Sequence, residues 1–283
     1  MSEFPRTEVE GVSLPRMLVG INWFLGYSHQ TAAKSKFITD YQDAKRVGAI
    51  IETFARAGCD CVYGVAHDRP LLLEAIKIAE DRTGKPITTI ALITIDTGDS
   101  QEAIDNNARL MDAQLTYGAK FFLPHQCSTD ALMDVRARKI RNMDRYCKMI
   151  RERGMIPGLS THSPEALIYA DETNLDVGTY IQIYNAAGFL MHVEVDWIHR
   201  VIQNAKKPVI CIKPMAAGRL HPLVGMAFAW ATIRPRDMVC VGTLTPDEAK
   251  ELIDLSLSLL ENRQAALDLQ ATRSKASLQS QDD

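Results

Sequence analysis

Histidine, lysine and aspartate side chains stand at the ends of several apolar segments of this chain. Five of them can transfer protons or bind a metal at neutral pH: His67, Asp96, His125, His162 and Lys213. An imidazole near its ordinary pKa exchanges protons near neutrality, so we assign the acid and base roles to His125 and His162. Asp96 and Lys213 would orient the substrate and polarise it.

Lys213 allows two interpretations. An inward amine that is partly withdrawn from water would have a lowered pKa, which suits Schiff-base formation or proton abstraction. A lysine at the rim would instead pair with Asp96 or Asp68. We favour the ion pair, because a nearby carboxylate would keep the amine charged.

A metal site is an alternative use of the same side chains. His67, Asp96, His125 and His162 would supply three nitrogens and one carboxylate, a set suited to zinc or another divalent ion. The spacing gives little support, since the chain has no His-x-His or His-Glu-x-x-His pair. The matching function would be that of a metal-dependent hydrolase or lyase.

Two loops near the C-terminus are candidates for holding an anionic group of a cofactor. Gly218 and Arg219 follow one apolar segment, and Gly242 and Thr243 follow the next, just before a helix start. Backbone N–H groups at a helix N-terminus bind phosphate well, and the guanidinium and hydroxyl would assist. The alternative is a glycine turn and a capped helix, with Arg219 in solvent. Candidates for substrate contact at other segment ends are Asn22, Trp23, His67, Asp68 and Asn185.

The apolar segments alternate with helical patterns along the whole chain. Strands are expected at Met17–Asn22, Cys61–Ala66, Ile87–Ile95, Lys120–Leu123, Met155–Leu159, Tyr180–Tyr184, Pro208–Lys213 and Met238–Gly242. This alternation predicts a single α/β domain, a (β/α)8 TIM barrel, which commonly takes about 250 residues. Because active sites of such barrels lie at the C-terminal ends of the strands, the polar side chains above should meet around one mouth.

The barrel is expected over residues 16–262, after a cover segment at 1–15 and before a fraying tail at 263–283. A helix is expected from Asp40 to Ala57. Residues 128–153 form a charged stretch that is expected to be mostly helical. Apolar spacing is poor before Met143, and we interpret that first half as an arm over the sheet.

Two helix starts carry capping signals. Asp99 and Glu102 should cap the helix after the third strand. Thr245, Pro246 and Glu248 predict a capping box at the last helix.

Composition indicates an ordinary soluble globular protein. The chain has 46% hydrophobic and 24% charged residues and a net charge of −3, with basic residues scattered among acids, so a nucleic-acid surface is not expected.

Neither the polar N-terminus nor Leu18–Gly26 has the length of apolar sequence needed for a secretory signal or a spanning helix. Cys59, Cys61, Cys211 and Cys240 lie in or beside expected strands and are taken as reduced. We expect a cytoplasmic protein with a small-molecule metabolite as its partner and no nucleic-acid or membrane partner.

Both ends of the chain resemble the aldo/keto reductase superfamily. GVSLPRMLVGINWF (Gly11–Phe24) is similar to its N-terminal hairpin and first strand, PVICIKPMAAGRL (Pro208–Leu220) to its seventh strand and loop, and VGTLTPDEAKEL (Val241–Leu252) to its eighth unit. The resemblance implies a barrel fold. It also implies reduction of a carbonyl with NADPH by an Asp, Tyr, Lys and His set.

The middle of the chain departs from that family pattern. Tyr63 stands where the family has its Asp, HDRPLLLEA offers no counterpart of the Tyr, and the third strand ends in Asp96 instead of the Lys. His125 in FFLPHQ matches, whereas basic residues that grip NADPH are not evident in GTLTPDEA. We therefore expect an enzyme for a small polar carbonyl or phosphorylated metabolite, with NADP as the cofactor that the resemblance implies. The alternatives are a divalent-metal hydrolase or lyase and a non-catalytic binding barrel.

Overall fold

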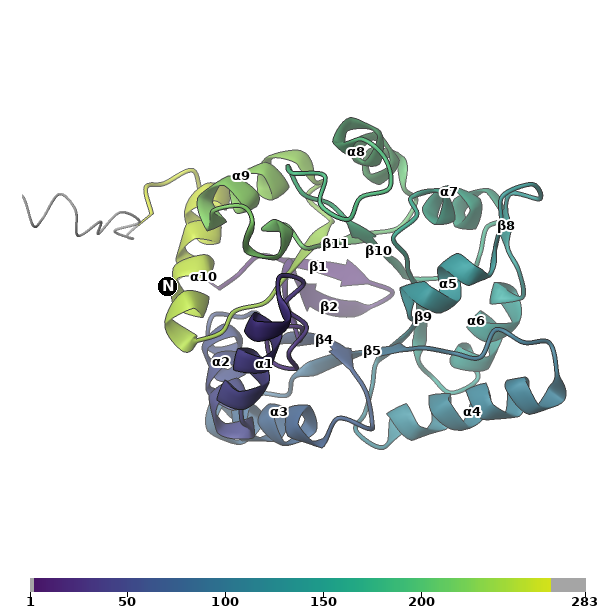
Figure 1. Ribbon diagram of the computed structural model, residues 1–283, viewed down its shortest axis with the longest axis horizontal. Helices are drawn as coiled ribbons and strands as arrows, with labels where there is room; N and C mark the ends of the chain where they lie inside the picture. Colours follow the sequence, from purple (N-terminus) through teal and green to yellow (C-terminus); the bar gives the residue numbers. More distant parts are fainter. Residues whose placement is uncertain (1–2, 266–283) are drawn as a thin grey trace, which may run out of the picture.

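The computed structural model describes residues 3–265, and its centre is a closed barrel of parallel strands ringed by helices (Figure 1). The barrel order is β10-β11-β12-β3-β4-β5-β6-β9, and the pairing of Cys240 with Leu18 joins the last strand to the first. The barrel strands are β3 (Met17–Gly20), β4 (Cys61–Val65), β5 (Thr88–Ile93), β6 (Phe121–Pro124), β9 (Ile156–Ser160), β10 (Thr179–Ile183), β11 (Val209–Ile212) and β12 (Met238–Val241). The expected TIM-barrel fold is thereby confirmed, and each strand overlaps its expected segment. Most of the tail expected at 263–283 lies outside the described residues.

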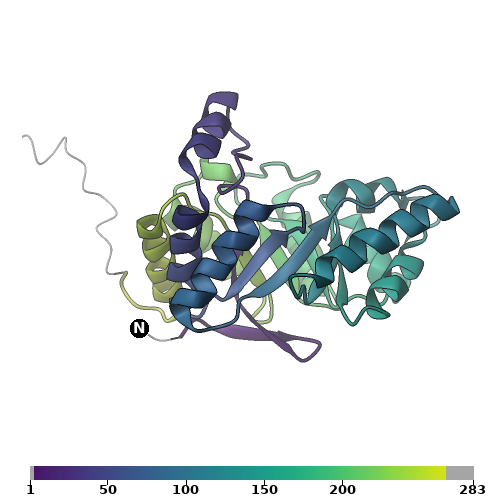
Figure 2. The ribbon, with the colours of Figure 1, turned by 90° about the horizontal axis from the view of Figure 1, so that it is seen from below.

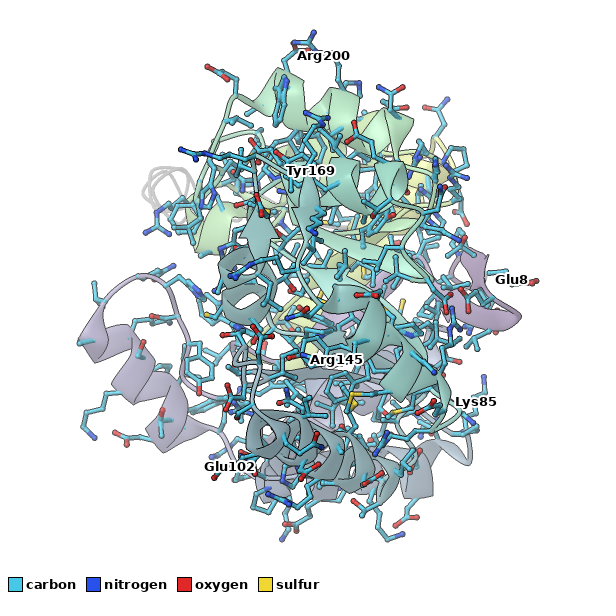
Figure 3. All side chains as sticks on the ribbon, turned by 90° about the vertical axis from the view of Figure 1, so that its right-hand side faces the viewer. Glu8, Lys85, Glu102, Arg145, Tyr169 and Arg200 are labelled. Carbon is cyan, nitrogen blue, oxygen red and sulfur yellow. The ribbon has the colours of Figure 1, made fainter. Side chains whose placement is uncertain are left out.

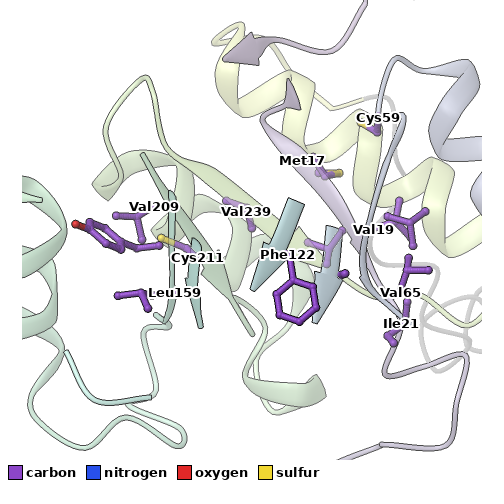
Figure 4. Close-up of a cluster of buried hydrophobic side chains, with 14 of the residues drawn as sticks. Met17, Val19, Ile21, Cys59, Val65, Phe122, Leu159, Val209, Cys211 and Val239 are labelled. Atoms are coloured by element: carbon purple, nitrogen blue, oxygen red, sulfur yellow. The ribbon is translucent and has the colours of Figure 1, made fainter. Parts of the chain in front are cut away.

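Helices cover the outside of the barrel. Between residues 3 and 265 they are α1 (Ala32–Tyr41), α2 (Ala44–Arg56), α3 (Pro70–Thr83), α4 (Gln101–Leu115), α5 (Gln126–Ala131), α6 (Met143–Arg151), α7 (Glu165–Glu172), α8 (Val195–Asn204), α9 (Pro222–Thr232) and α10 (Pro246–Leu260), with a 3-10 turn, η1, at Ala216–Gly218. The outward side chains of the strands, such as Val19, Val65, Phe122 and Val209, form the core under these helices (Figure 4). Burying this apolar face supplies most of the driving force that holds helix to sheet.

The inward side chains form a second core inside the barrel. Leu18, Tyr63, Leu123 and Cys240 belong to it, and they alternate along their strands with the outward residues. Side chains on a strand change face at every residue, so the positions two residues beyond an inward one also face inward. This period directs His125, two residues after Leu123, towards the barrel axis.

A hairpin of β1 (Arg6–Val9) and β2 (Val12–Pro15) closes the N-terminal end of the barrel. Val9 and Leu14 pack with the inward core, and Arg6 lies 2.9 Å from Asp60, just before β4. Figure 2 shows the hairpin at one end of the molecule and α1 projecting from the opposite end. The C-terminal ends of the strands are therefore the open end.

Three local expectations were wrong. The helix expected at Asp40–Ala57 is two helices, because Gln42 takes an extended backbone and the Asp43 side chain caps α2 at the N–H of Arg46. Ser100, not Asp99, caps α4. The arm expected in the first half of 128–153 is instead the end of α5 and a small antiparallel hairpin of β7 (Met133–Asp134) and β8 (Lys139–Ile140), whereas the second half contains the expected helix, α6.

Charged side chains of both signs project from the outer elements, among them Lys85, Glu102 and Arg200 (Figure 3). This mixture agrees with the small net charge of −3. All six cysteines are free thiols, and five of them are buried. In the part of the chain that the structure covers, no helix has the length and apolar character required to cross a membrane.

Candidate active site

Lys213 stands at the mouth of the barrel, directly after β11. Its φ of 59° is the left-handed conformation that residues other than glycine seldom adopt, and such strain is found most often at functional sites. Its amine interacts electrostatically with Cys240 of the inward core and with imidazoles on other strands. Burial lowers the pKa of Lys213.

The ion pair expected for Lys213 is not formed. Among residues 3–265 the lysines in ion pairs are Lys36, Lys77, Lys148 and Lys250, all at the surface. Asp96 is exposed, and its carboxylate accepts the backbone N–H of Gly98 at 2.9 Å. The reason is local: β5 ends at Ile93, so Asp96 belongs to the loop before α4 rather than to the strand end.

His125 and His162 follow the adjacent strands β6 and β9 and both interact with Lys213. Burial, and then the positive charge of Lys213, lower the pKa of both imidazoles, that of His162 to about 4. Both rings are therefore neutral at neutral pH and can accept a proton. These two expected residues and Lys213 are brought together by the fold.

Two further histidines complete the cluster, and sequence reasoning missed both. His29 lies in the loop between β3 and α1, where burial and Lys213 lower its pKa. His192 lies in the loop between β10 and α8, with its ring centroid 6.3 Å from that of His162 and the planes at 81°. Neither follows a strand directly, so the strand-end rule gave no signal for them. We call Lys213, His29, His125, His162 and His192 the mouth cluster.

One carboxylate lies beside the mouth cluster. Asp130 of α5 accepts the hydroxyl hydrogen of Thr161 at 2.5 Å and the backbone N–H of His162 at 3.4 Å. Burial raises the pKa of Asp130, and the facing His192 opposes that rise. Below the cluster, the Ser160 hydroxyl faces the phenol of Tyr63, whose pKa burial raises. The sequence did not single out Asp130.

His67 does not join the cluster. Its Nδ1 lies 2.8 Å from the amide nitrogen of Gln114, and its backbone N–H donates to the same amide. Its neighbour Asp68 is exposed. With His67 and Asp96 engaged elsewhere, the four ligands expected for a metal do not converge, and no three His, Cys, Asp or Glu within the described part of the chain are arranged to hold one.

Arg219 contacts two neighbouring loops, and Asn185 stabilises the loop that contains it. The Arg219 guanidinium lies 3.9 Å from the centroid of the Phe189 ring and donates to the carbonyls of His29 and Ala216. Arg219 remains exposed to solvent while it makes these contacts. The fully buried Asn185 uses its amide nitrogen and oxygen on the backbone of Phe189. Gly218, at the end of η1, has a φ of 85° and would bring any Cβ to 2.7 Å from Gln30 Nε2.

The residues after β12 pack closely against the first loop. A Cβ on Gly242 would lie 3.1 Å from Trp23 Cδ1, and the Trp23 ring is also 5.3 Å from the Lys34 amine. The carbonyl of Asn22 accepts the N–H of Tyr27 within that loop.

The N-terminus of α10 is closed by its own side chains. Thr245 accepts the N–H of Glu248, whose carboxylate accepts the N–H of Leu244 at 2.6 Å. This is a capping box shifted by one residue. Thr243 is 5% exposed, and its hydroxyl has no hydrogen-bond partner among the described residues.

A groove of about 360 Å³ lies between α7 and α8, on the outside of the barrel. Trp197, Leu167 and Asp171 are among the residues that line it. Since it lies behind the strands, it is separate from the mouth cluster.

Comparison with known proteins gives a likeness of fold. No family model and no curated protein matches the chain. A putative aldo-keto reductase from Pseudomonas aeruginosa superposes with a TM-score of 0.63 and 12% identity over 90% of this chain and 95% of that one. The barrel has the aldo/keto reductase fold. The glycerol dehydrogenase of Gluconobacter oxydans (TM-score 0.55, 11% identity, 89% and 95% covered) and an aldo/keto reductase of Klebsiella pneumoniae in complex with NADP and acetate (0.55, 14%, 99% and 95%) are similar as well.

Proposed function

We propose that this protein is a barrel enzyme that converts a small carbonyl-containing metabolite through the amine of Lys213. The surroundings of that amine carry the proposal. Burial lowers its pKa, imidazoles and the Cys240 thiol are the groups that interact with it, and the ion pair that would keep it charged is absent among residues 3–265. A neutral amine is the form that attacks a carbonyl carbon.

The chemistry would proceed through a Schiff base. The nitrogen of Lys213 bonds to the carbonyl carbon while the C=O π pair moves to oxygen, and a neutral imidazole carries a proton from nitrogen to that oxygen. Loss of water, with a second proton delivered to the departing hydroxyl, leaves the imine. Both amine hydrogens end in the water released. His125 and His162 are suited to this proton relay, because both are neutral at pH 7 and both face Lys213.

The imine would then act as an electron sink for the neighbouring carbon. The imine nitrogen takes up a proton, a base removes a proton from that carbon, and the electron pair moves towards the nitrogen, which gives a neutral enamine. The depressed pKa of His162, about 4, favours the free base at neutral pH. Proton exchange, cleavage or condensation at that carbon would follow from the same intermediate.

Borohydride trapping tests the proposal directly. Purified protein is incubated with small aldehydes, ketones and 2-oxo acids, reduced with borohydride, and analysed by peptide mass spectrometry. We expect an adduct on the peptide that contains Lys213, heavier by the carbonyl compound less one oxygen atom. Lys213→Arg keeps a positive charge but cannot form an imine, so it should abolish that adduct, whereas the exposed Lys36→Arg should not. Adducts spread evenly over surface lysines, or none at all, would refute the proposal.

A second candidate is carbonyl reduction with NADP, which the Klebsiella pneumoniae structure with NADP and acetate favours. The residues after β11 and β12 do not fit that ligand. The Arg219 guanidinium is stacked on Phe189, and the α10 N-terminus presents the carboxylates of Asp247 and Glu248 where a phosphate would need N–H donors. We therefore derive no hydride-transfer step. A thermal shift of several degrees with NADPH, together with NADPH-dependent turnover of a carbonyl compound, would restore this candidate, whereas a shift with NADPH without turnover would favour a binding role.

A further inference from the structure

The mouth cluster brings together one amine and four imidazoles, and we propose that it binds an oxyanion, a phosphate or carboxylate group, carried by the substrate next to its reacting carbonyl. The inference deepens the proposed function and rests on it. It places the anion at the imidazoles around Lys213. The glycine loops after β11 and β12, where sequence reasoning looked for an anion, are then not needed.

The geometry of the cluster supports this placement. His29, His125, His162 and His192 come from four different loops, and three of them interact electrostatically with Lys213. His192 faces His162 edge to face with centroids 6.3 Å apart. Imidazole N–H groups and an amine that approach from several sides form a set of donors which an oxyanion can accept together.

The charge balance around the cluster also favours an anion. Arg69 faces His125, and Arg219 faces His29, so the rim adds positive charge. Asp130 supplies the carboxylate beside the cluster, with Glu165 near it. One oxygen of Asp130 accepts from the Thr161 hydroxyl and the other from the His162 backbone N–H. The positive charges of Lys213, Arg69 and Arg219 act on the imidazoles, and a bound oxyanion would offset them.

Binding of the anion should be coupled to uptake of protons. In the free protein, burial and then the positive charge of Lys213 lower the pKa of His29, His125 and His162, so these rings are neutral at pH 7. A negative charge beside them favours the protonated form and raises their pKa. Protons taken up by the imidazoles would offset part of the charge of the anion beside Lys213. Affinity should therefore fall as pH rises through the pKa values of the complex.

Calorimetric titration of the full chain with sulfate and with acetate tests the inference. Sulfate represents a phosphate dianion, acetate represents a carboxylate, and neither titrates between about pH 6 and pH 8. We expect one of them to bind at a single site, with a heat that depends on the ionisation enthalpy of the buffer, and with roughly tenfold weaker affinity near pH 8 than near pH 6. Sulfate binding would indicate a phosphorylated carbonyl compound, and acetate binding a 2-oxo acid.

Variants locate the site. His29→Gln and His192→Gln should weaken binding about tenfold each, because each removes one imidazole donor. The control His67→Gln removes an imidazole at the same end of the barrel that is bonded to Gln114 instead. Equal effects in all three variants would overturn the assignment. Should a variant fold poorly, the buffer and pH dependence of the unaltered protein decides alone.

The test separates this inference from the proposed function, since neither probe contains a reactive carbonyl. Absence of binding by both probes, with an intact Lys213 adduct in the trapping experiment, would overturn the oxyanion site and leave the amine chemistry standing. Binding without any adduct would sustain the oxyanion site and refute the role of Lys213.

Discussion

Folding the chain should become less favourable in mild acid, and His162 should account for a measurable part of the loss. Its pKa is 6.5 in an unfolded chain and about 4 in the fold, because the ring is buried beside Lys213 and other imidazoles. Between those values the unfolded chain binds a proton that the folded chain does not. The contribution of His162 to the free energy of unfolding is therefore fully present above about pH 6.5, and it is lost progressively as pH falls towards about 4.

The magnitude follows from the same two values. A pH of 5 lies about 1.5 units below the pKa of the imidazole in the unfolded chain. Each unit corresponds to about 1.4 kcal/mol, so the free energy of unfolding falls by about 2 kcal/mol at this pH. His162 is only partly buried, and solvent screening lowers the value towards about 1 kcal/mol. Near pH 7 the penalty is close to zero. Replacing His162 by Gln, which carries no charge in either state, should remove the difference.

Urea unfolding of the unaltered protein and of His162→Gln, near pH 7 and near pH 5, measures this contribution. We expect the variant to gain about 1–2 kcal/mol relative to the unaltered protein on going from the higher to the lower pH. His67→Gln serves as the control, since its ring is bonded to Gln114 outside the mouth cluster. An identical pH dependence in the unaltered protein and His162→Gln would mean that the ring is not held neutral by its surroundings.

Two further substitutions test the packing around the barrel. Asp237→Ala should cost about 3–5 kcal/mol in urea unfolding, because the fully buried carboxylate accepts the N–H of Val209 and a two-point contact from Arg234, which would lose its counter-charge. A loss below about 1 kcal/mol would show that Arg234 finds other partners. Thr243→Val should leave stability unchanged or raise it by up to about 1 kcal/mol, since the buried hydroxyl has no partner among the described residues. A clear loss of stability would mean that this hydroxyl is bonded in solution.

Much of the fold could be predicted from the sequence because its strands are buried on both faces. Runs such as Ile87–Ile95 hold aliphatic residues and threonines with no charged residue, and a parallel strand covered by helices has that pattern. The limits of the elements were less predictable. Asp40 to Ala57 has a continuous helical pattern. The side-chain amide of Gln42 nevertheless donates to the distant Leu244 carbonyl, and the helix is interrupted at Gln42. A contact across 202 residues leaves no local signal.

The candidate site was predictable where strand register sets the direction of a side chain. His125 and His162 follow buried strands at positions where alternation turns them inward, and both lie near Lys213. Asp96 and His67 also follow strands, but a turn at Gly98 and the amide of Gln114 hold them outside the cluster. The position of a residue after a strand identifies the loops that form the barrel mouth. It does not determine which side chains of those loops point into the mouth.

The missing carboxylate beside Lys213 is the finding that changes the chemistry. With Asp96 or Asp68 as its partner, the amine would be a fixed positive charge and could only orient an anion or polarise a carbonyl. Beside imidazoles, burial lowers the pKa of the amine, and its positive charge lowers the pKa of His29, His125 and His162 in turn. A substrate that brings a negative group would shift the distribution of protons between the amine and the rings. Substrate binding can then set the protonation state of the imidazoles at the moment when the carbonyl reaches the amine.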